Sequence, residues 1–206
     1  ADPGIQLLSG ESTVMTAAQA GNGAVVRALL EAGADPNIAV TREQTALMWA
    51  AGRGHAGVVA ALIDHGANLN ARSEIREHYV KSEKEQDSHP DYKYWTELGG
   101  NTPLIFAARA GDLDSVKLLV DAGADVNTPD NDGVTPVYIA AHWGNQECLQ
   151  MLIDAGANVR TPANDGTTPL EMARQNEHQQ CVVMIERKLD PRYNRPTKSA
   201  NMQKLV

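Results

Sequence analysis

The chain has 206 residues, of which 42% are hydrophobic but only 4% aromatic, so small aliphatic side chains must supply most of any core. No run of apolar residues approaches the roughly 18 that a membrane-spanning helix needs, and a soluble protein is therefore expected. Residues 1–186 carry 25 acidic and 12 basic side chains, whereas six basic side chains and Asp190 alone follow from Arg187 onward; most of the chain should repel phosphate backbones, which argues against nucleic-acid binding.

The start of the chain leaves two compartments open. Ala1 is preceded by neither an initiator Met nor a signal peptide, which fits a shortened chain or the mature form of an exported protein. Both a cytoplasmic and an exported location agree with this start, and two cysteines form no disulfide framework that would decide between them. We expect residues 1–11 to be an N-terminal segment outside the folded repeats.

From Ser12 onward the sequence repeats itself with a period of 33 residues. The residues that predict helix starts lie at intervals of 33, 57, 33 and 33, so one interval holds 24 extra residues; they are Ser12, Thr45, Thr102, Thr135 and Thr168. Gly-Ala-Asp or Gly-Ala-Asn triplets follow the same spacing and begin at Gly33, Gly66, Gly123 and Gly156. A fixed period of this length indicates a solenoid, whose units bury their apolar faces by stacking on one another.

Each unit is predicted to form two short helices and a projecting loop. In the fourth unit Thr135 is placed to cap the first helix, and Pro136 takes the first helical position, where a missing N–H costs nothing. That helix ends at a glycine for which we expect positive φ, and the glycines at this position are Gly21, Gly54, Gly111 and Gly144. The next residue should cap the second helix; it is Asn22, His55, Asp112, Asn145 or His178.

The third unit resembles the ankyrin repeat. It reads Thr102-Pro103-Leu104 with Ala107-Ala108, then Gly111, Leu118-Leu119 and Gly123-Ala124-Asp125-Val126-Asn127. The resemblance covers roughly residues 12–188, and it is specific because the pattern recurs in register. It implies an all-α ankyrin-repeat solenoid of five repeats over residues 12–189, which is not an enzyme and binds other proteins.

Some residues depart from the ankyrin pattern. The histidine that usually follows Thr-Pro-Leu is replaced in every unit, by Met15, Met48, Ile105, Tyr138 and Glu171. The first unit has Thr13 in place of proline, and the last has Glu177 in place of the turn glycine. Looser first and last units are expected of terminal repeats, because one face of each meets water.

The 24 extra residues form an insertion at about 73–97, between the second and third repeats, where repeat units have their projecting loop. Its first part is charged, whereas its second part contains Tyr92, Tyr94 and Trp95. Aromatic residues with polar tips are favoured at interfaces, so we interpret this long loop as a partner-binding element. A lid packed on its own repeats and a mobile loop are the alternatives.

The resemblance also implies which face binds: the loop tips and the exposed side of the first helices. The matching first-helix positions just before the turn are Gln19, Arg53, Arg109, His142, Trp143, Gln175 and Asn176. We interpret Trp143 as a binding anchor, with coverage of the neighbouring repeat as the alternative. Trp49 is predicted to lie in the core, in one column with Phe106 and Ile139. The loop-tip candidates are Arg42, Asn131, Asp132, Asn164 and Asp165, and turn formation is a competing explanation for all but Arg42.

No residue pattern favours catalysis, a cofactor or a metal site. Cys148 and Cys181 are 33 residues apart and should occupy equivalent positions of packed helices, roughly 8–10 Å apart and too far for a disulfide. We therefore expect both to be small core residues. His78 and His89 lie near carboxylates in the insertion but without metal-ligand spacing, and the Asp130 to Gly133 segment lacks the glutamate of a calcium loop.

The predicted function is non-catalytic recognition of another protein through the concave first-helix face, the loop tips and the insertion. No nucleic acid or small-molecule substrate is expected as a partner. Two alternatives remain: a permanent subunit of a larger assembly, and an inhibitor or regulator of an enzyme that uses the insertion as its blocking segment. The basic tail, residues 190–206, is expected to be a solvated end, with contact to an acidic partner as the alternative.

Overall fold

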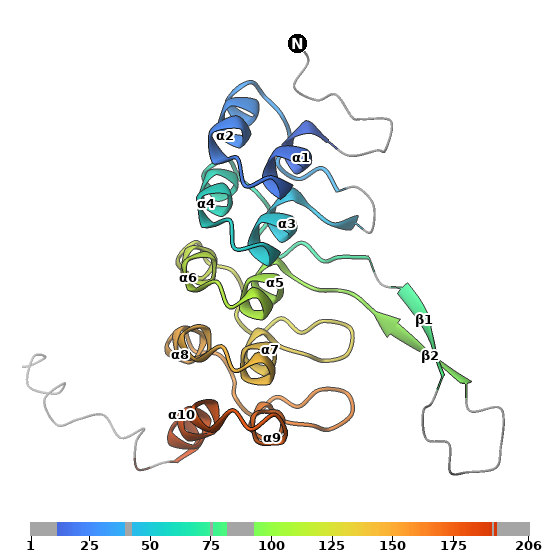
Figure 1. Cartoon of the computed structure of the whole chain (residues 1–206), viewed down its shortest axis with the longest axis vertical. Helices are drawn as coiled ribbons and strands as arrows, with labels where there is room; N and C mark the ends of the chain where they lie inside the picture. Colours follow the sequence, from blue (N-terminus) through green and yellow to red (C-terminus); the bar gives the residue numbers. More distant parts are fainter. Residues whose placement is uncertain (1–11, 40–42, 75, 82–92, 191, 193–206) are drawn as a thin grey trace, which may run out of the picture.

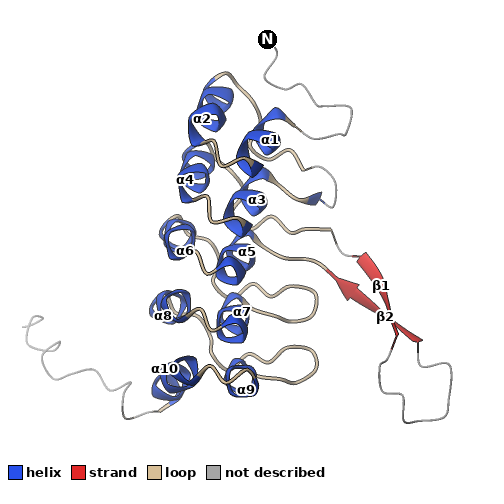
Figure 2. Cartoon of the chain, in the orientation of Figure 1, coloured by secondary structure: helices blue, strands red, loops and turns tan. Residues whose placement is uncertain are grey.

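The protein is a stack of helix pairs. The computed structural model describes residues 12–39, 43–74, 76–81, 93–190 and 192. Within these residues ten helices form five pairs along one axis (Figure 1), which confirms the expected helical solenoid. The first helices of the pairs are α1 (Thr13–Gln19), α3 (Ala46–Gly52), α5 (Pro103–Ala110), α7 (Pro136–Trp143) and α9 (Pro169–Gln175). The second helices are α2 (Gly23–Glu31), α4 (Ala56–Asp64), α6 (Leu113–Asp121), α8 (Gln146–Asp154) and α10 (Gln179–Leu189). They form two columns, with the loops projecting beyond the first helices (Figure 2).

The predicted caps set the boundaries of the first helices. A hydroxyl accepts the backbone N–H three residues later at 3.2–3.4 Å in every pair, at Ser12, Thr45, Thr102, Thr135 and Thr168. The turns after α1, α3, α5 and α7 contain glycines with φ between 70° and 72°, as expected. In the last pair Glu177 adopts a φ of 60° at the same position.

The predicted caps of the second helices are confirmed at Asn22 and Asp112 but wrong at His55, Asn145 and His178, which make no side-chain cap hydrogen bond. Two of these side chains bind the preceding repeat instead. The Asn145 amide donates to the Ala108 carbonyl at 2.8 Å, and His178 Nε2 lies 3.0 Å from the His142 carbonyl oxygen. Stacking of the repeats therefore competes with capping for the same polar side chain.

One apolar core runs through all five pairs. Its largest fully buried side chains include Leu47, Leu62, Leu104, Leu119 and Leu149. Cys148 and Cys181 are buried free thiols within it, as predicted. Burial raises the pKa of Cys148 to about 11 and also raises the pKa of Cys181, so both behave as small apolar groups.

An asparagine ladder joins the repeats at the base of their loops. The Oδ1 atoms of Asn37, Asn70 and Asn127 accept a backbone N–H from the next repeat at 2.7, 3.0 and 2.8 Å. These donors belong to Asn68, Asp125 and Asn158, the third residues of the Gly-Ala-Asp/Asn triplets. Because each bond crosses an interface between repeats, the ladder fixes the register in which the repeats stack.

The insertion contains a two-stranded antiparallel ribbon of β1 (Arg76–Lys81) and β2 (Lys93–Leu98), where the sequence predicts a loop. The ribbon projects away from the helix columns (Figure 1). Its base is closed at Ser73, whose carbonyl accepts the Gly100 N–H at 3.0 Å and whose N–H donates to the Asn101 carbonyl at 3.1 Å. The charged residues of β1 show no alternation of apolar and polar side chains, so the strand has no clear signal in the sequence.

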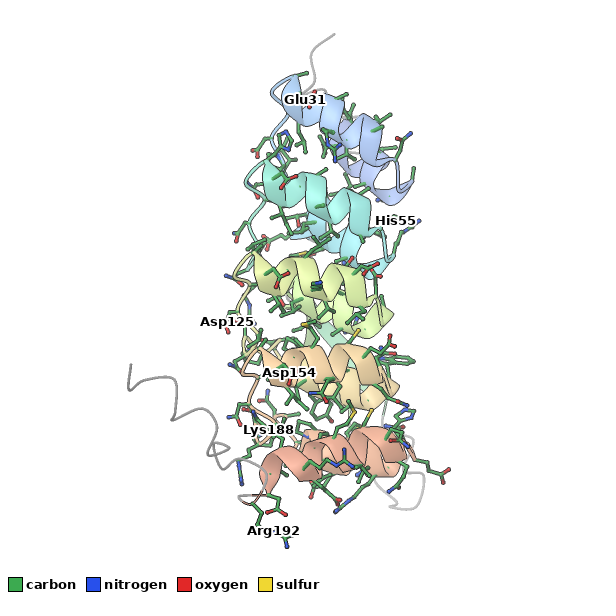
Figure 3. The ribbon with its side chains drawn as sticks, turned by 90° about the vertical axis from the view of Figure 1, so that its left-hand side faces the viewer. Glu31, His55, Asp125, Asp154, Lys188 and Arg192 are labelled. Atoms are coloured by element: carbon green, nitrogen blue, oxygen red, sulfur yellow. The ribbon has the colours of Figure 1, made fainter. Side chains whose placement is uncertain are left out.

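The second helices form the acidic face of the molecule. Each of α2, α4, α6 and α8 ends in an exposed carboxylate, and Figure 3 labels two of these residues, Glu31 and Asp154. Among the described residues, none of the helices combines the length and the apolar composition that crossing a bilayer requires.

Candidate partner-binding face

The repeat register brings the predicted first-helix residues into one row, which we call the first-helix face. All of them sit at the C-terminal ends of stacked helices: Gln19 in α1, Arg53 after α3, Arg109 in α5, His142 and Trp143 in α7, and Gln175 and Asn176 at the end of α9. Arg53, Arg109, Trp143, Gln175 and Asn176 are exposed, whereas Gln19 and His142 are half-buried.

Trp143 is the most accessible aromatic residue whose side chain the structure describes. Its exposed fraction is 54%, and the only other large apolar side chain exposed in the described part of the chain is Val25. The indole ring meets the His142 ring edge-on, with centroids 5.2 Å apart and an interplanar angle of 70°. Over half of this large aromatic surface is therefore available to a partner.

Arg53 and Arg109 lie beside aromatic rings of their own helices. The Arg53 guanidinium carbon is 5.3 Å from the Trp49 ring centroid, and that of Arg109 is 5.8 Å from the Phe106 centroid. Arg53 donates to the Gln19 carbonyl at 3.2 Å, and Arg109 donates to Asn101 Oδ1 at 3.1 Å. Both contacts leave further guanidinium donors facing outward on exposed side chains.

Gln175 and Asn176 belong to the last repeat and differ in how firmly they are held. The Asn176 amide donates to the Met172 carbonyl at 3.0 Å, which ties it to its own helix. Arg174 of the same helix forms an ion pair with Glu186 of α10 at 2.6 Å. At this end of the face Arg174 has a charged partner within the protein, whereas Arg53 has, among the described residues, only a backbone carbonyl as its hydrogen-bond partner.

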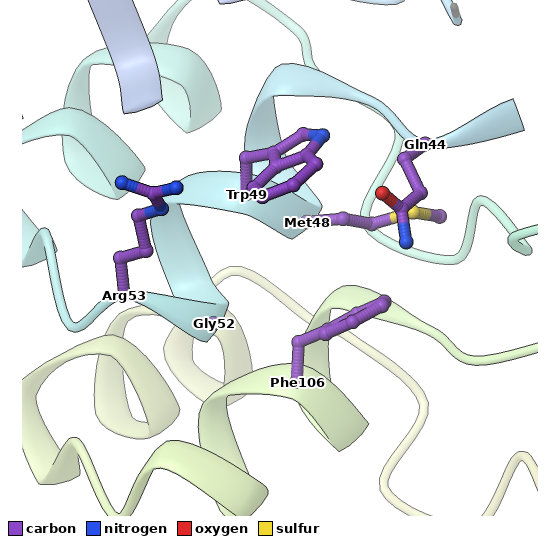
Figure 4. A pocket seen from close by; sticks show the side chains of 6 residues that line it. All are labelled: Gln44, Met48, Trp49, Gly52, Arg53 and Phe106. Carbon is purple, nitrogen blue, oxygen red and sulfur yellow. The ribbon is translucent and has the colours of Figure 1, made fainter. Parts of the chain in front are cut away.

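The prediction that Trp49 lies in the core is wrong. The residue is half-buried, and with Phe106 it lines a pocket of about 330 Å³ on the first-helix face (Figure 4). The column that Trp49 shares with Phe106 and Ile139 lies at the edge of the core, where only Ile139 is buried. The sequence held one signal for this pocket: two large aromatic residues at the same position of consecutive repeats, 57 residues apart.

Most loop-tip candidates support the loops themselves. Asp130 accepts hydrogen bonds from the N–H groups of Asp132 and Val134 at 3.0 and 2.8 Å. These bonds lower the pKa of the Asp130 carboxyl group, but burial raises it by more. The Asn164 amide donates to the Asn131 carbonyl at 2.9 Å and so joins two successive loops. Asp165 accepts the Thr167 N–H at 2.8 Å. Turn formation and loop stacking account for these residues, as the competing explanation predicts.

The structure describes only some of the candidate residues in the loop before α3 and in the insertion. Arg42 and Tyr92 lie outside the described residues. Tyr94 and Trp95 lie in β2, where their backbones pair with Val80 and Tyr79 of β1.

The charges differ between the two columns of helices. The first helices and their caps carry Arg53, Arg109 and Arg174 against Glu171 alone. The second helices carry acidic residues in excess, namely Glu31, Asp64, Asp114, Asp121, Glu147, Asp154 and Glu186 against Arg27, Lys117, Arg187 and Lys188. The first helices and their caps are thus the basic column of helices in an acidic protein.

Two kinds of described side chains bear on a catalytic role: clusters that could hold a metal ion, and free thiols. No group of three or more His, Cys, Asp or Glu residues among the described residues is arranged to hold a metal ion. The two thiols have raised pKa values and are buried, which opposes their use as nucleophiles. What this surface presents instead is exposed aromatic area with cations beside it, a combination suited to binding.

Comparison with known proteins agrees with the repeat pattern. A family model described as ankyrin repeats (3 copies) matches residues 1–73, 73–163 and 104–195. No curated protein matches the chain.

Proposed function

Because the chain belongs to the ankyrin-repeat family, we propose that it is a non-catalytic recognition module that binds a partner protein through the first-helix face, the loop tips and the ribbon. Ankyrin repeats are in general protein–protein interaction modules and are typically not enzymes. The partner-binding residues in this proposal are Arg42, Arg53, Arg109, His142, Trp143, Gln175 and Asn176, together with Tyr92, Tyr94 and Trp95 of the insertion.

The observation that carries the proposal is the exposure of Trp143 in the middle of the first-helix face. A Trp that is 54% exposed leaves a large apolar area in water, which a partner can cover. Arg53 and Arg109 precede it along the same row of helix ends. Exposed Trp and Arg residues are the types that most often dominate binding energy at protein interfaces.

The ribbon extends this surface beyond the helices. It leaves the solenoid between the second and third repeats, and its second strand carries Tyr94 and Trp95. In the proposal these aromatic residues and Tyr92 close over the partner while the first-helix face binds its other side. Two backbone hydrogen bonds of Ser73 close the base of the ribbon where it leaves the solenoid, which supports this role.

Trp143→Ala tests the proposal. The intact protein, used as bait in extracts of the cells that encode it, should capture a partner reproducibly, and the purified partner gives a dissociation constant for each variant. If Trp143 is an anchor, its loss should weaken binding by about 2 kcal/mol or more, which is roughly 30-fold. The melting temperature should change little. Arg27→Ala, an exposed change on the acidic face, is the control and should leave binding intact.

A large melting shift with intact binding would assign Trp143 to the fold and remove the main support of the proposal. The two alternatives give different results. A permanent subunit should self-associate or behave poorly in isolation, which sedimentation would detect. An enzyme inhibitor should lose inhibition when residues 74–97 are deleted while its repeats stay folded.

A further inference from the structure

The pocket between Trp49 and Phe106 has two aromatic walls and polar ends. The walls come from α3 and α5, and the almost fully buried Met48 lies behind them. Figure 4 shows the indole and phenyl rings on opposite sides of the opening, with Gln44 at one end and Arg53 at the other. Its volume of about 330 Å³ is at the lower limit for ligand pockets, so one bulky side chain and its neighbours would fill it.

Gly52 is the reason why this pocket exists. The equivalent positions of the other four repeats hold long side chains: Gln19, Arg109, His142 and Gln175. A Cβ atom at Gly52 would point at Phe106 and lie 3.3 Å from its Cδ1. Any longer side chain at Gly52 would therefore enter the space between the two repeats.

The charge around the pocket favours an anionic partner. Arg53 lines one end, and Arg109 lies against the second wall, 5.8 Å from the Phe106 centroid. Neither arginine takes part in the ion pairs between described residues, which join Arg174 to Glu186 and Arg192 to Asp190. The charge of Arg109 lowers the pKa of Asp130, but it is the smallest of the effects on that carboxyl group.

We infer that this pocket receives a bulky apolar side chain from an extended acidic segment of the partner protein, while a neighbouring carboxylate of that segment binds Arg53. The inference rests on the proposed function, because it says which side chains of the partner would bind to the same first-helix face. A guanidinium held beside an indole still offers a planar pair of donors to a carboxylate. The apolar side chain supplies binding energy between the rings, and the carboxylate supplies selectivity against basic segments.

A library of random 12-residue peptides displayed on phage tests the inference with the full chain as target. Enriched peptides should share Leu, Ile, Met, Phe or Trp within two positions of Asp or Glu. In a synthetic peptide with the enriched sequence, replacing that apolar residue by Ala, or the acidic residue by its amide, should weaken binding at least tenfold. Enrichment of basic peptides, or of none, would overturn the inference.

Two protein variants locate the site. Gly52→Gln fills the pocket with a side chain that two other repeats carry at this position, and it should weaken the peptide at least tenfold. Arg53→Ala should weaken it by a similar factor, whereas Arg27→Ala on the acidic face should change it less than twofold. Circular dichroism melting of each variant confirms that it is folded. Retained affinity in folded Gly52→Gln would show that the peptide binds elsewhere.

Methyl NMR gives a second readout that needs no substitution in the pocket. In protein labelled at its methionine methyl groups, the peptide should shift the resonance of Met48 and leave those of Met151 and Met184, which line a groove on the other column of helices. An unshifted Met48 would overturn the inference.

The outcomes separate the inference from the proposed function. A peptide or partner that is weakened by Trp143→Ala but not by Gly52→Gln leaves the recognition role in place and removes the role of the pocket. The reverse result leaves the pocket as a peptide site and removes Trp143 as the anchor.

Discussion

Gly52 of α3 faces Phe106 of α5 so closely that a Cβ atom at Gly52 would lie 3.3 Å from Phe106 Cδ1. Gly52 has a helical backbone, and its φ is not positive, so the chain there does not require glycine. The atom that a new side chain would meet belongs to a half-buried ring and not to the backbone. Glycine at this position therefore shapes the surface and is not needed for the fold.

Gly52→Gln should consequently leave stability almost unchanged. Gln is favoured over Gly within a helix by somewhat less than about 1 kcal/mol, which offsets the cost of moving the Phe106 ring. We expect the free energy of unfolding, measured in urea, to change by less than about 0.5 kcal/mol. Gly111→Gln is the matched control. Gly111 has a φ of 71° and a Cβ there would lie 2.8 Å from Asn145 Oδ1, so this change should cost about 2 kcal/mol or more.

Removal of the ribbon should leave the solenoid intact. Deleting residues 74–97 shortens the interval between Thr45 and Thr102 from 57 to the ordinary 33 residues. Ser73 and Gly100 already approach one another through a 3.0 Å backbone hydrogen bond, so a short connection can replace the ribbon. We expect an unchanged helical circular dichroism signal and an unfolding free energy within about 1 kcal/mol of the intact protein. A loss of cooperative unfolding would instead identify the insertion as a lid packed on its own repeats.

The sequence predicts the helical stack well because the boundaries of the first helices are set by residues close to them. Thr135 caps α7 and Gly144 ends it through contacts within a few residues, and the 33-residue period repeats this information. Cys148 and Cys181 are correctly predicted as core residues for the same reason, since their position in the period is that of the buried Val58.

The errors occur where contacts between repeats decide the structure. Asn145 has the side chain of a cap, yet its amide binds the Ala108 carbonyl of the preceding repeat. Trp49 occupies the column of the buried Ile139, but it is half-buried and lines a pocket together with Gly52 and Phe106. The ribbon depends on pairing between β1 and β2, which residues 82–92 separate in the sequence, and the charged β1 sequence gives no local sign of this pairing.

Glu177→Gly should stabilise the protein. Glu177 adopts a φ of 60° in the turn after α9, where the other repeats have glycine with a φ of 70–72°. A left-handed conformation costs a residue other than glycine roughly 1–2 kcal/mol, and part of this gain is lost because glycine has more freedom in the unfolded chain. We expect the free energy of unfolding in urea to rise by about 0.5–1 kcal/mol. Gln180→Gly, an exposed helical position in α10, is the control and should lower it by about 1 kcal/mol.

The thiol of Cys148 should make stability depend on pH in the alkaline range. Burial raises its pKa from 9.0 to about 11, with smaller contributions from the charges of Asp112 and Glu147. Above pH 9.0 the thiol of the unfolded protein loses its proton, whereas the thiol of the folded protein keeps its proton up to about pH 11. The contribution of this thiol to the free energy of unfolding is therefore complete below pH 9.0 and is lost as the pH rises to about 11.

Cys148→Val measures that contribution, because Val58 fills the same position of the second repeat and is buried there. Between pH 8 and pH 11 the unfolding free energy of the original protein should fall by about 2 kcal/mol more than that of the variant. Iodoacetamide at pH 8 should leave both thiols of the native protein unmodified and should modify both in guanidinium chloride. Equal losses of stability in the two proteins, or rapid modification of native Cys148, would show that this thiol is in contact with water.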